Sequence, residues 1–152
     1  RINKEFSLAS LRGKPVLLIF YLGKGCLHCM EQLNKFDPVA DRFSGQDISI
    51  FAVSSDTVTG LKDTLIGYAD KDRHFSFPLL SDPSLGMFKA YRAYDDFEKT
   101  PLHGTFLIDG NGKVRCQNIS YEPFMEPDFV ISERLRLSGK SRPPALDRRK
   151  KL

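Results

Sequence analysis

The chain has 152 residues, 41% of them hydrophobic and 28% charged, which suits one globular domain with a single core. Its longest apolar run, from Val16 to Leu22, is far shorter than the roughly 18–20 residues of a membrane span, so we expect a soluble protein. Three cysteines cannot all pair within one chain, which excludes a small secreted fold stapled by disulfides and favours a chemical use of the thiols.

The net charge of +4 is unevenly distributed along the chain. Residues 138–152 carry six basic side chains against Asp147 alone, whereas residues 1–137 carry 17 basic and 18 acidic ones and are close to neutral. We therefore predict one domain over residues 1–137 and a basic flexible tail over residues 138–152. Because no aromatic residue interleaves the basic ones, we expect a linker or terminal extension, with no nucleic-acid partner and no membrane span.

The first half of the chain predicts alternating strands and helices. Residues 16–21 follow a Gly-Lys-Pro turn and show no polar alternation, which predicts a strand buried on both faces of a sheet. Apolar residues spaced by three and four predict a helix over residues 26–43, with a kink at Pro38. Residues 48–53 predict a second strand, followed by a small polar cap and a helix over residues 57–69.

The second half predicts a short strand, a helix, a hairpin and a closing helix. Residues 77–80 contain Pro78, which favours an edge strand or a linker, and Asp82 with Pro83 suits the start of a helix that reaches about Tyr91. Residues 105–108 and 113–116 flank an Asp-Gly-Asn-Gly turn, a strong hairpin signal, and residues 127–137 predict the last helix. This order predicts an α/β fold with a mixed central β-sheet flanked by helices.

Cys26 and Cys29 form a C-x-x-C motif between the first predicted strand and the first predicted helix, the context that is typical of a redox dithiol. A helix N-terminus presents unsatisfied N–H groups and a partial positive charge of about half a unit, which favour the reactive thiolate. His28 can carry positive charge or donate a hydrogen bond, so we expect it to lower the pKa of a thiol and to make the pair relatively oxidising.

Two other interpretations of the motif stay open. A zinc site needs four ligands, and beyond the two motif cysteines the chain offers Cys116, His74 and His103 without a second close pair. Both motif cysteines can instead be inert residues on a helix face. Cys116 alternates with Val114 on a predicted strand, which favours a small buried hydrophobe over a resolving thiol.

Several segments occur in an order that is specific in combination. They are residues 11–18, 20–21, 25–29, 32–33, 53–56, 77–83, 104–109 and 112–114. With them the chain resembles the thioredoxin-fold superfamily, and within it the AhpC/TSA redoxins, which comprise peroxiredoxins and peroxiredoxin-like proteins that keep a C-x-x-C. The resemblance implies a thioredoxin-like fold, with helices on both faces of the sheet, and an oxidoreductase or antioxidant activity. The family's leading segment is missing, so we expect a piece of a longer chain.

The resemblance breaks at the residues that bind peroxide. Peroxidatic members surround their reactive cysteine with a Pro, a Thr or Ser three residues before it, and a distant Arg. When the chain is aligned with that pattern, Leu22 takes the position of the Pro and Cys26 the position of the Thr. Cys29 takes the position of the peroxidatic cysteine, and His103 takes that of the Arg. His103 also stands where thioredoxin-like oxidoreductases carry a cis-proline, so it either tunes the sulfurs or is a buried histidine at a strand end.

Our main hypothesis is a thiol–disulfide oxidoreductase, with Cys26 as the exposed attacking thiolate, Cys29 as the resolving thiol and His28 as the pKa tuner. His103, Tyr21, Leu22 and Gly25 are expected to line this site. The first alternative is a thiol peroxidase in which Cys29 attacks peroxide and Cys26 resolves the sulfenic acid.

An alternative of another class is a redoxin-fold protein that holds copper or zinc through Cys26, Cys29 and a histidine. A non-catalytic docking module with a redox-silent dithiol is the fourth hypothesis. The expected partners are protein or small-molecule thiols and disulfides, or peroxide, and the main hypothesis needs no cofactor and no metal. An oxidising dithiol favours a periplasmic or exported protein over a cytoplasmic one, although the chain shows no signal peptide. The oligomeric state is not readable from the sequence.

Overall fold

The computed structural model describes residues 7–23, 25–68 and 74–139, with only the backbone described for residues 66–68. The predicted tail therefore lies outside the described residues from position 140 onward, as does the start of the chain up to residue 6. Within the described part, no helix is long and apolar enough to cross a membrane.

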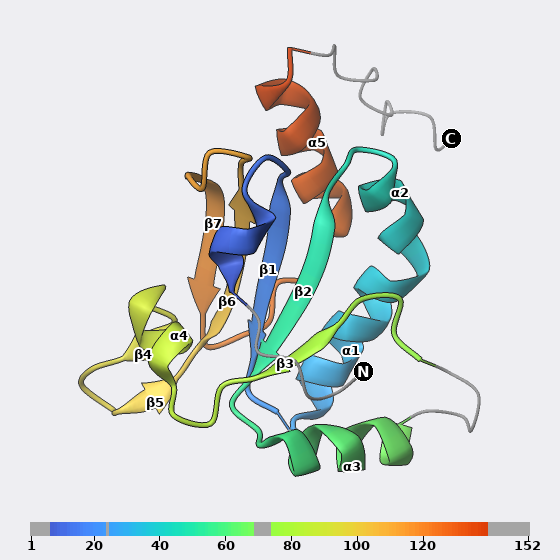
Figure 1. Cartoon of the computed structure of the whole chain (residues 1–152). Helices are drawn as coiled ribbons and strands as arrows, with labels where there is room; N and C mark the ends of the chain where they lie inside the picture. Colours follow the sequence, from blue (N-terminus) through green and yellow to red (C-terminus); the bar gives the residue numbers. More distant parts are fainter. Residues whose placement is uncertain (1–6, 24, 69–73, 140–152) are drawn as a thin grey trace, which may run out of the picture.

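Five strands form the central sheet, in the order β3-β2-β1-β6-β7 (Figure 1). Their bounds are Val16–Tyr21 for β1, Ser49–Ser54 for β2, Leu79–Ser81 for β3, His103–Ile108 for β6 and Val114–Ser120 for β7. Strands β1, β2 and β3 run parallel, whereas β6 pairs antiparallel with both β1 and β7. The predicted mixed sheet is confirmed, with β3 at its edge.

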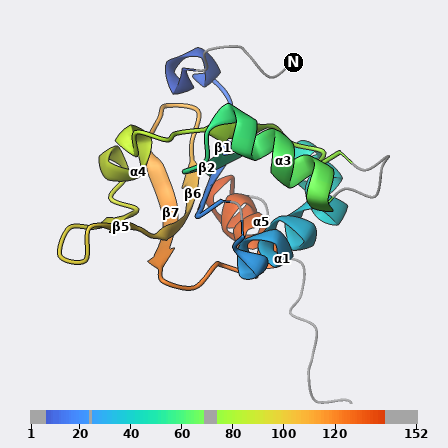
Figure 2. The same ribbon diagram turned by 90° about the horizontal axis from the view of Figure 1, so that it is seen from below.

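Helices cover both faces of this sheet, as predicted (Figure 2). The α-helices are α1 Leu27–Phe36, α2 Ala40–Ser44, α3 Val58–Tyr68, α4 Gly86–Ala90 and α5 Pro127–Leu137. Two 3-10 turns, η1 Leu8–Leu11 and η2 Asp37–Val39, complete the helical elements. Side chains of α1, α2 and α5 pack on one face, and side chains of α4 and η1 pack on the other.

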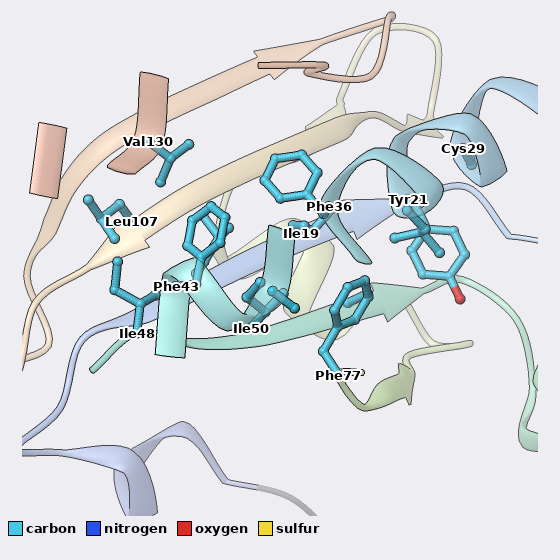
Figure 3. Close-up of a cluster of buried hydrophobic side chains, with 14 of the residues drawn as sticks. Ile19, Tyr21, Cys29, Phe36, Phe43, Ile48, Ile50, Phe77, Leu107 and Val130 are labelled. Carbon is cyan, nitrogen blue, oxygen red and sulfur yellow. The ribbon is translucent and has the colours of Figure 1, made fainter. Parts of the chain in front are cut away.

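Strand β1 supplies both cores because successive side chains of a strand point to opposite faces. Leu17 and Ile19 belong to the cluster under α1, α2 and α5, which Figure 3 shows in close-up. Leu18 and Phe20 belong to the cluster under α4. All six residues of β1 are buried, which confirms the strand predicted to be covered on both sides.

The interruption predicted at Pro38 is confirmed, and it is stronger than a kink. The 3-10 turn η2, which contains Pro38, divides the helix predicted over residues 26–43 into α1 and α2. Proline has no N–H to donate and its ring crowds the preceding turn, so the chain changes direction at this position. Asp37, beside the break, also accepts a hydrogen bond from the backbone N–H of Ser76 at 2.6 Å.

The predicted helix start at Pro83 is wrong. The carboxylate of Asp82 accepts hydrogen bonds from the backbone N–H groups of Met87 and Phe88, so α4 begins only at Gly86. Sequence analysis missed a small second sheet of two strands, β4 Tyr94–Asp95 and β5 Thr100–Pro101. Two residues per strand are too few to show a period in the sequence.

The predicted hairpin is confirmed, and its turn is held by the side chain of Asp109. The Oδ1 atom accepts hydrogen bonds from the backbone N–H groups of Asn111 and Lys113, both at 2.9 Å. The alternation in the sequence predicts that Val114 and Cys116 share the inward face of β7. The pairing of β6 with β7 is irregular between Leu107 and Ile108, so the two side chains do not share one face. As a result Cys116 is half-buried against the core, whereas Val114 is exposed.

Candidate active site

The two motif cysteines form a disulfide, with their Cα atoms 5.3 Å apart, where β1 ends and α1 begins (Figure 1). The turn before it has Gly23 at φ +98° and Gly25 at φ +86°, backbone angles that glycine adopts without strain. The backbone N–H of Cys26 donates to the Gly23 carbonyl at 3.2 Å and closes this turn. The predicted role of Gly25 as a neighbour of the dithiol therefore has a physical basis in the backbone.

The two sulfurs occupy different environments. Cys26 is the N-cap of α1, and its Sγ accepts a hydrogen bond from the backbone N–H of Cys29 at 3.3 Å. A negative charge on that sulfur is stabilised by the N–H group and by the positive end of the helix dipole. Cys26 is partly exposed, but Cys29 is completely buried. From solvent, an attacking thiolate reaches Cys26 first.

His103 lies against both sulfurs at the start of β6. Its Nε2 atom is 3.1 Å from the Sγ of Cys29 and 3.9 Å from the Sγ of Cys26, although 74 and 77 residues separate these positions in the chain. The side chain is buried. The two interpretations left open by the sequence are therefore compatible, because a buried histidine at a strand end is also a contact of the dithiol.

The tautomer of His103 follows from its second hydrogen bond. Its Nδ1 lies 3.0 Å from the backbone carbonyl of Tyr121, which can only accept, so Nδ1 carries the proton. In the neutral ring, Nε2 then presents a lone pair to the sulfurs. Burial lowers the pKa of His103 and favours this neutral form, and it outweighs the hydrogen bond to the Tyr121 carbonyl and the carboxylate of Glu122, which act in the opposite direction.

His28 points away from the pair that it was predicted to tune. Its side chain is 70% exposed, and its Nδ1 lies 3.3 Å from a carboxylate oxygen of Glu31. No described contact joins His28 to either sulfur. The disulfide form therefore shows no described hydrogen bond between His28 and either sulfur, and the tuning role stays a prediction.

Two further predicted lining residues, Tyr21 and Leu22, contribute to the wall below the dithiol. Tyr21 is buried in the same core cluster as Cys29, and its hydroxyl points away from that cysteine (Figure 3). Among the described residues this hydroxyl lies beside that of Ser54 without making a hydrogen bond of normal geometry, and burial raises the pKa of Tyr21 more than Ser54 lowers it. The carbonyl of Leu22 accepts a hydrogen bond from the Ser55 hydroxyl at 2.8 Å.

Sequence analysis missed Tyr121 and Gln32, which hold the site together. Tyr121 fixes His103 through its carbonyl, and its hydroxyl donates to a carboxylate oxygen of Asp95 on β4. Gln32, buried on α1, donates to the Phe124 carbonyl at 3.0 Å and to the Thr105 hydroxyl at 3.4 Å. No local pattern marks these residues, because their partners come from distant strands.

Two positions at which this chain differs from the peroxide-binding pattern of the family lie together in this site. Cys26 stands where the family resemblance places a Thr, His103 stands where it places an Arg, and both contact Cys29. The ligand atoms of Cys26, Cys29 and His103 all lie within 4.8 Å of one another. In the described part of the chain they are also the one group of three or more His, Cys, Asp or Glu residues with metal-binding spacing.

The strand–disulfide–helix arrangement on a mixed sheet defines a thioredoxin-fold protein with a disulfide at a helix N-terminus. Comparisons with known proteins then narrow the class. The profile of the AhpC/TSA family matches residues 1–117. The chain belongs to this family, and it is a redox enzyme of the peroxiredoxin type.

Known relatives agree with this assignment. A protein named thioredoxin peroxidase, from Fasciola hepatica, is 26% identical over 145 residues, which cover 90% of this chain and 71% of the relative. Chloroplastic peroxiredoxin Q from Sedum lineare is 28% identical, covering 89% and 69%. The crystal structure of reduced 2-Cys peroxiredoxin from Plasmodium vivax superimposes with a TM-score of 0.76 at 22% identity, covering 87% and 82%, and this likeness confirms the fold.

Proposed function

We propose that this protein is a thiol peroxidase that uses Cys29 to reduce peroxide and Cys26 to resolve the product. The observation that carries the proposal is the Cys26–Cys29 disulfide at the N-terminus of α1 in a member of the AhpC/TSA family. Cys29 occupies the position that the family resemblance gives to the peroxidatic cysteine. The names of two relatives, thioredoxin peroxidase and peroxiredoxin Q, support the same choice.

The reaction has three balanced steps. The sulfur of reduced Cys29 attacks one peroxide oxygen, the O–O bond breaks, and an alcohol or water leaves while Cys29 becomes a sulfenic acid. The thiolate of Cys26 then attacks the Cys29 sulfur, a water leaves, and the observed disulfide forms. Two thiols of an external reductant restore the dithiol and are themselves oxidised to a disulfide.

Each residue of the site has a function in these steps. The partly exposed Sγ of Cys26 receives the attack of the external thiol, and Cys29, at the buried end, then leaves. The Nε2 of His103 can accept a hydrogen bond from the reduced Cys29 thiol, since it lies 3.1 Å from that sulfur. Because Cys29 is completely buried in the disulfide form, the proposal requires that opening the disulfide lets peroxide reach its sulfur.

Thiol–disulfide exchange without peroxide is the second candidate. The difference in exposure between the sulfurs favours it, because the reachable Cys26 is also the one stabilised as a thiolate by the N–H of Cys29. It is also favoured by Leu22, Cys26 and His103, which replace the usual peroxide-binding residues of the family. In both candidates the same disulfide exchanges with an external thiol.

A single-turnover experiment distinguishes the two candidates. Reduced protein, freed of reductant, is mixed with one equivalent of hydrogen peroxide, and remaining peroxide and free thiols are measured. We expect one peroxide consumed and two thiols lost per chain in the wild type and in Cys116→Ser. Cys26→Ser should still consume one peroxide and become labelled by a sulfenic-acid reagent at residue 29, and Cys29→Ser should consume none.

The contrary result is equally clear. If wild-type protein leaves the peroxide intact but exchanges with a protein disulfide, and if Cys29→Ser traps a mixed disulfide at Cys26 while Cys26→Ser traps none, exchange is the function. Cys116→Ser is the matched control, because Cys116 pairs with Leu107, roughly 13 Å along the strands from the start of β6.

A further inference from the structure

Cys26, Cys29 and His103 present three metal-ligating atoms that face one another. A metal ion held at about 2.3 Å from each sulfur and about 2.0 Å from nitrogen, in a trigonal plane, requires nitrogen–sulfur separations of about 3.7 Å. The observed separations from Nε2, 3.1 Å and 3.9 Å, lie on either side of this value. Such a site also requires that the two sulfurs separate to about 4.0 Å once the disulfide is reduced, which rotation of the cysteine side chains would provide.

The orientation of His103 supports a ligand role. Its Nδ1–H donates to the Tyr121 carbonyl, which leaves the Nε2 lone pair directed at the sulfurs. Metal-binding histidines are oriented in this way, with the second ring nitrogen donating to a carbonyl or carboxylate. In the disulfide form neither sulfur carries a hydrogen, so this buried lone pair faces no donor there.

The donor set selects the metal. Two thiolates and one imidazole suit copper(I) and zinc. Zinc takes four ligands, either four from the protein in a structural site or three and a water in a catalytic site. No fourth Cys, His, Asp or Glu joins this group in the described part of the chain, so zinc would need a water here. Copper(I) accepts three ligands, and the N-terminus of α1 offsets the net negative charge that two thiolates and one monovalent ion carry.

We propose that the reduced protein binds one copper(I) ion through the Sγ atoms of Cys26 and Cys29 and the Nε2 atom of His103. A two-electron oxidant, such as a peroxide or the disulfide of another thiol compound, converts both thiolates to the disulfide and is itself reduced, and the ion is then released as copper(I). Metal binding and disulfide formation therefore exclude each other. This inference does not depend on peroxide reduction. It requires only that the disulfide can be reduced.

The test is an anaerobic titration of the reduced full chain with copper(I) against a coloured copper(I) chelator. We expect one ion per chain for the wild type and for Cys116→Ser, whose side chain lies outside the ligand group. Cys26→Ser, Cys29→Ser and His103→Ala should each bind at least about 100-fold more weakly, since even the loss of a residue that supports a ligand costs 10–100-fold.

X-ray absorption on the copper-loaded wild type keeps the proposal testable if a variant fails to fold. Two sulfur ligands and one nitrogen ligand support it. Copper held by two sulfurs alone, an unchanged affinity in His103→Ala, no stoichiometric binding, or tighter retention of zinc than of copper(I) would each overturn it. Peroxide is absent throughout, so loss of peroxidase activity and loss of copper binding are separate results.

Discussion

The two faces of the central sheet differ in what they bury. Under α4, the rings of Phe20, Phe88, Phe106 and Tyr91 pack with centroids 4.9 to 5.6 Å apart. Under α1, the core also contains the polar groups of Tyr21, Gln32 and His103 together with the disulfide. The aromatic rings under α4 stabilise the fold and offer no reactive group. The face under α1 holds the dithiol and buries polar atoms, which costs free energy unless those atoms are hydrogen-bonded.

The same strands produce this difference. On β6, the side chains of Thr105 and Leu107 point toward α1. Gly104 and Phe106 face the opposite side, where the rings under α4 pack, which we call the aromatic face. A Cβ at Gly104 would lie 2.7 Å from the Phe106 ring and 3.1 Å from Ala93, so the aromatic face is closely packed even there. We therefore expect the aromatic face to respond to substitutions mainly through stability.

Phe20→Ala should have the largest effect on stability, because it removes a completely buried ring from the aromatic face. We expect the free energy of unfolding to fall by about 3–5 kcal/mol. Urea unfolding measures it, and the folded fraction should still form the disulfide. Phe97→Ala, at a side chain that is 90% exposed, is the control and should change the value by less than about 0.5 kcal/mol.

Gln32→Ala tests the face under α1, which buries the polar groups and the dithiol. The change leaves the Phe124 carbonyl without its donor in a buried place, so we expect a loss of about 1–3 kcal/mol in the free energy of unfolding. Unlike Phe20→Ala, it should also change the reactivity of the dithiol, since Gln32 links α1 to Thr105 on the strand that carries His103. A variant with wild-type thiol kinetics would show that this link does not support the site.

Tyr21→Phe should act in the opposite direction. Within the described residues the Tyr21 hydroxyl is buried beside the Ser54 hydroxyl but makes no hydrogen bond of normal geometry, and such a poorly paired group costs stability. We expect the free energy of unfolding to stay level or to rise by about 1 kcal/mol, measured by urea titration at pH 7. A clear decrease would mean that the hydroxyl has a partner on which the face depends.

Asp95→Asn should have the smallest effect. The hydrogen bond from the Tyr121 hydroxyl, with backbone N–H groups of residues 98 and 97, lowers the pKa of Asp95. Because the folded-state pKa is the lower one, this stabilisation is present above the ordinary carboxyl pKa and is lost as the pH falls through the lowered value. Unfolding titrations from pH 7 to pH 2 should show a shallower acid decline in the variant, and identical profiles would count against the contact.

Periodicity and local chemistry predicted much of the fold. Six consecutive apolar residues predicted β1, the Asp-Gly-Asn-Gly turn predicted the hairpin, and the alternation of elements predicted the mixed sheet. The start of α4 was wrong by three residues, because the carboxylate of Asp82 caps the N–H groups of Met87 and Phe88 and not those of the residues directly after it. Elements of two residues, such as β4 and β5, are too short to carry any period.

The sequence by itself determined that a C-x-x-C pair follows a buried strand and begins a helix, because both the motif and its flanking patterns are local. Tertiary structure decided which histidine meets the sulfurs. His28 lies between the two cysteines in the chain yet faces solvent, whereas His103 reaches them because β6 pairs antiparallel with β1. The orientation of its ring depends on Tyr121, a residue beyond the next strand. Such contacts follow from strand register and from the path of the chain, which no window of sequence contains.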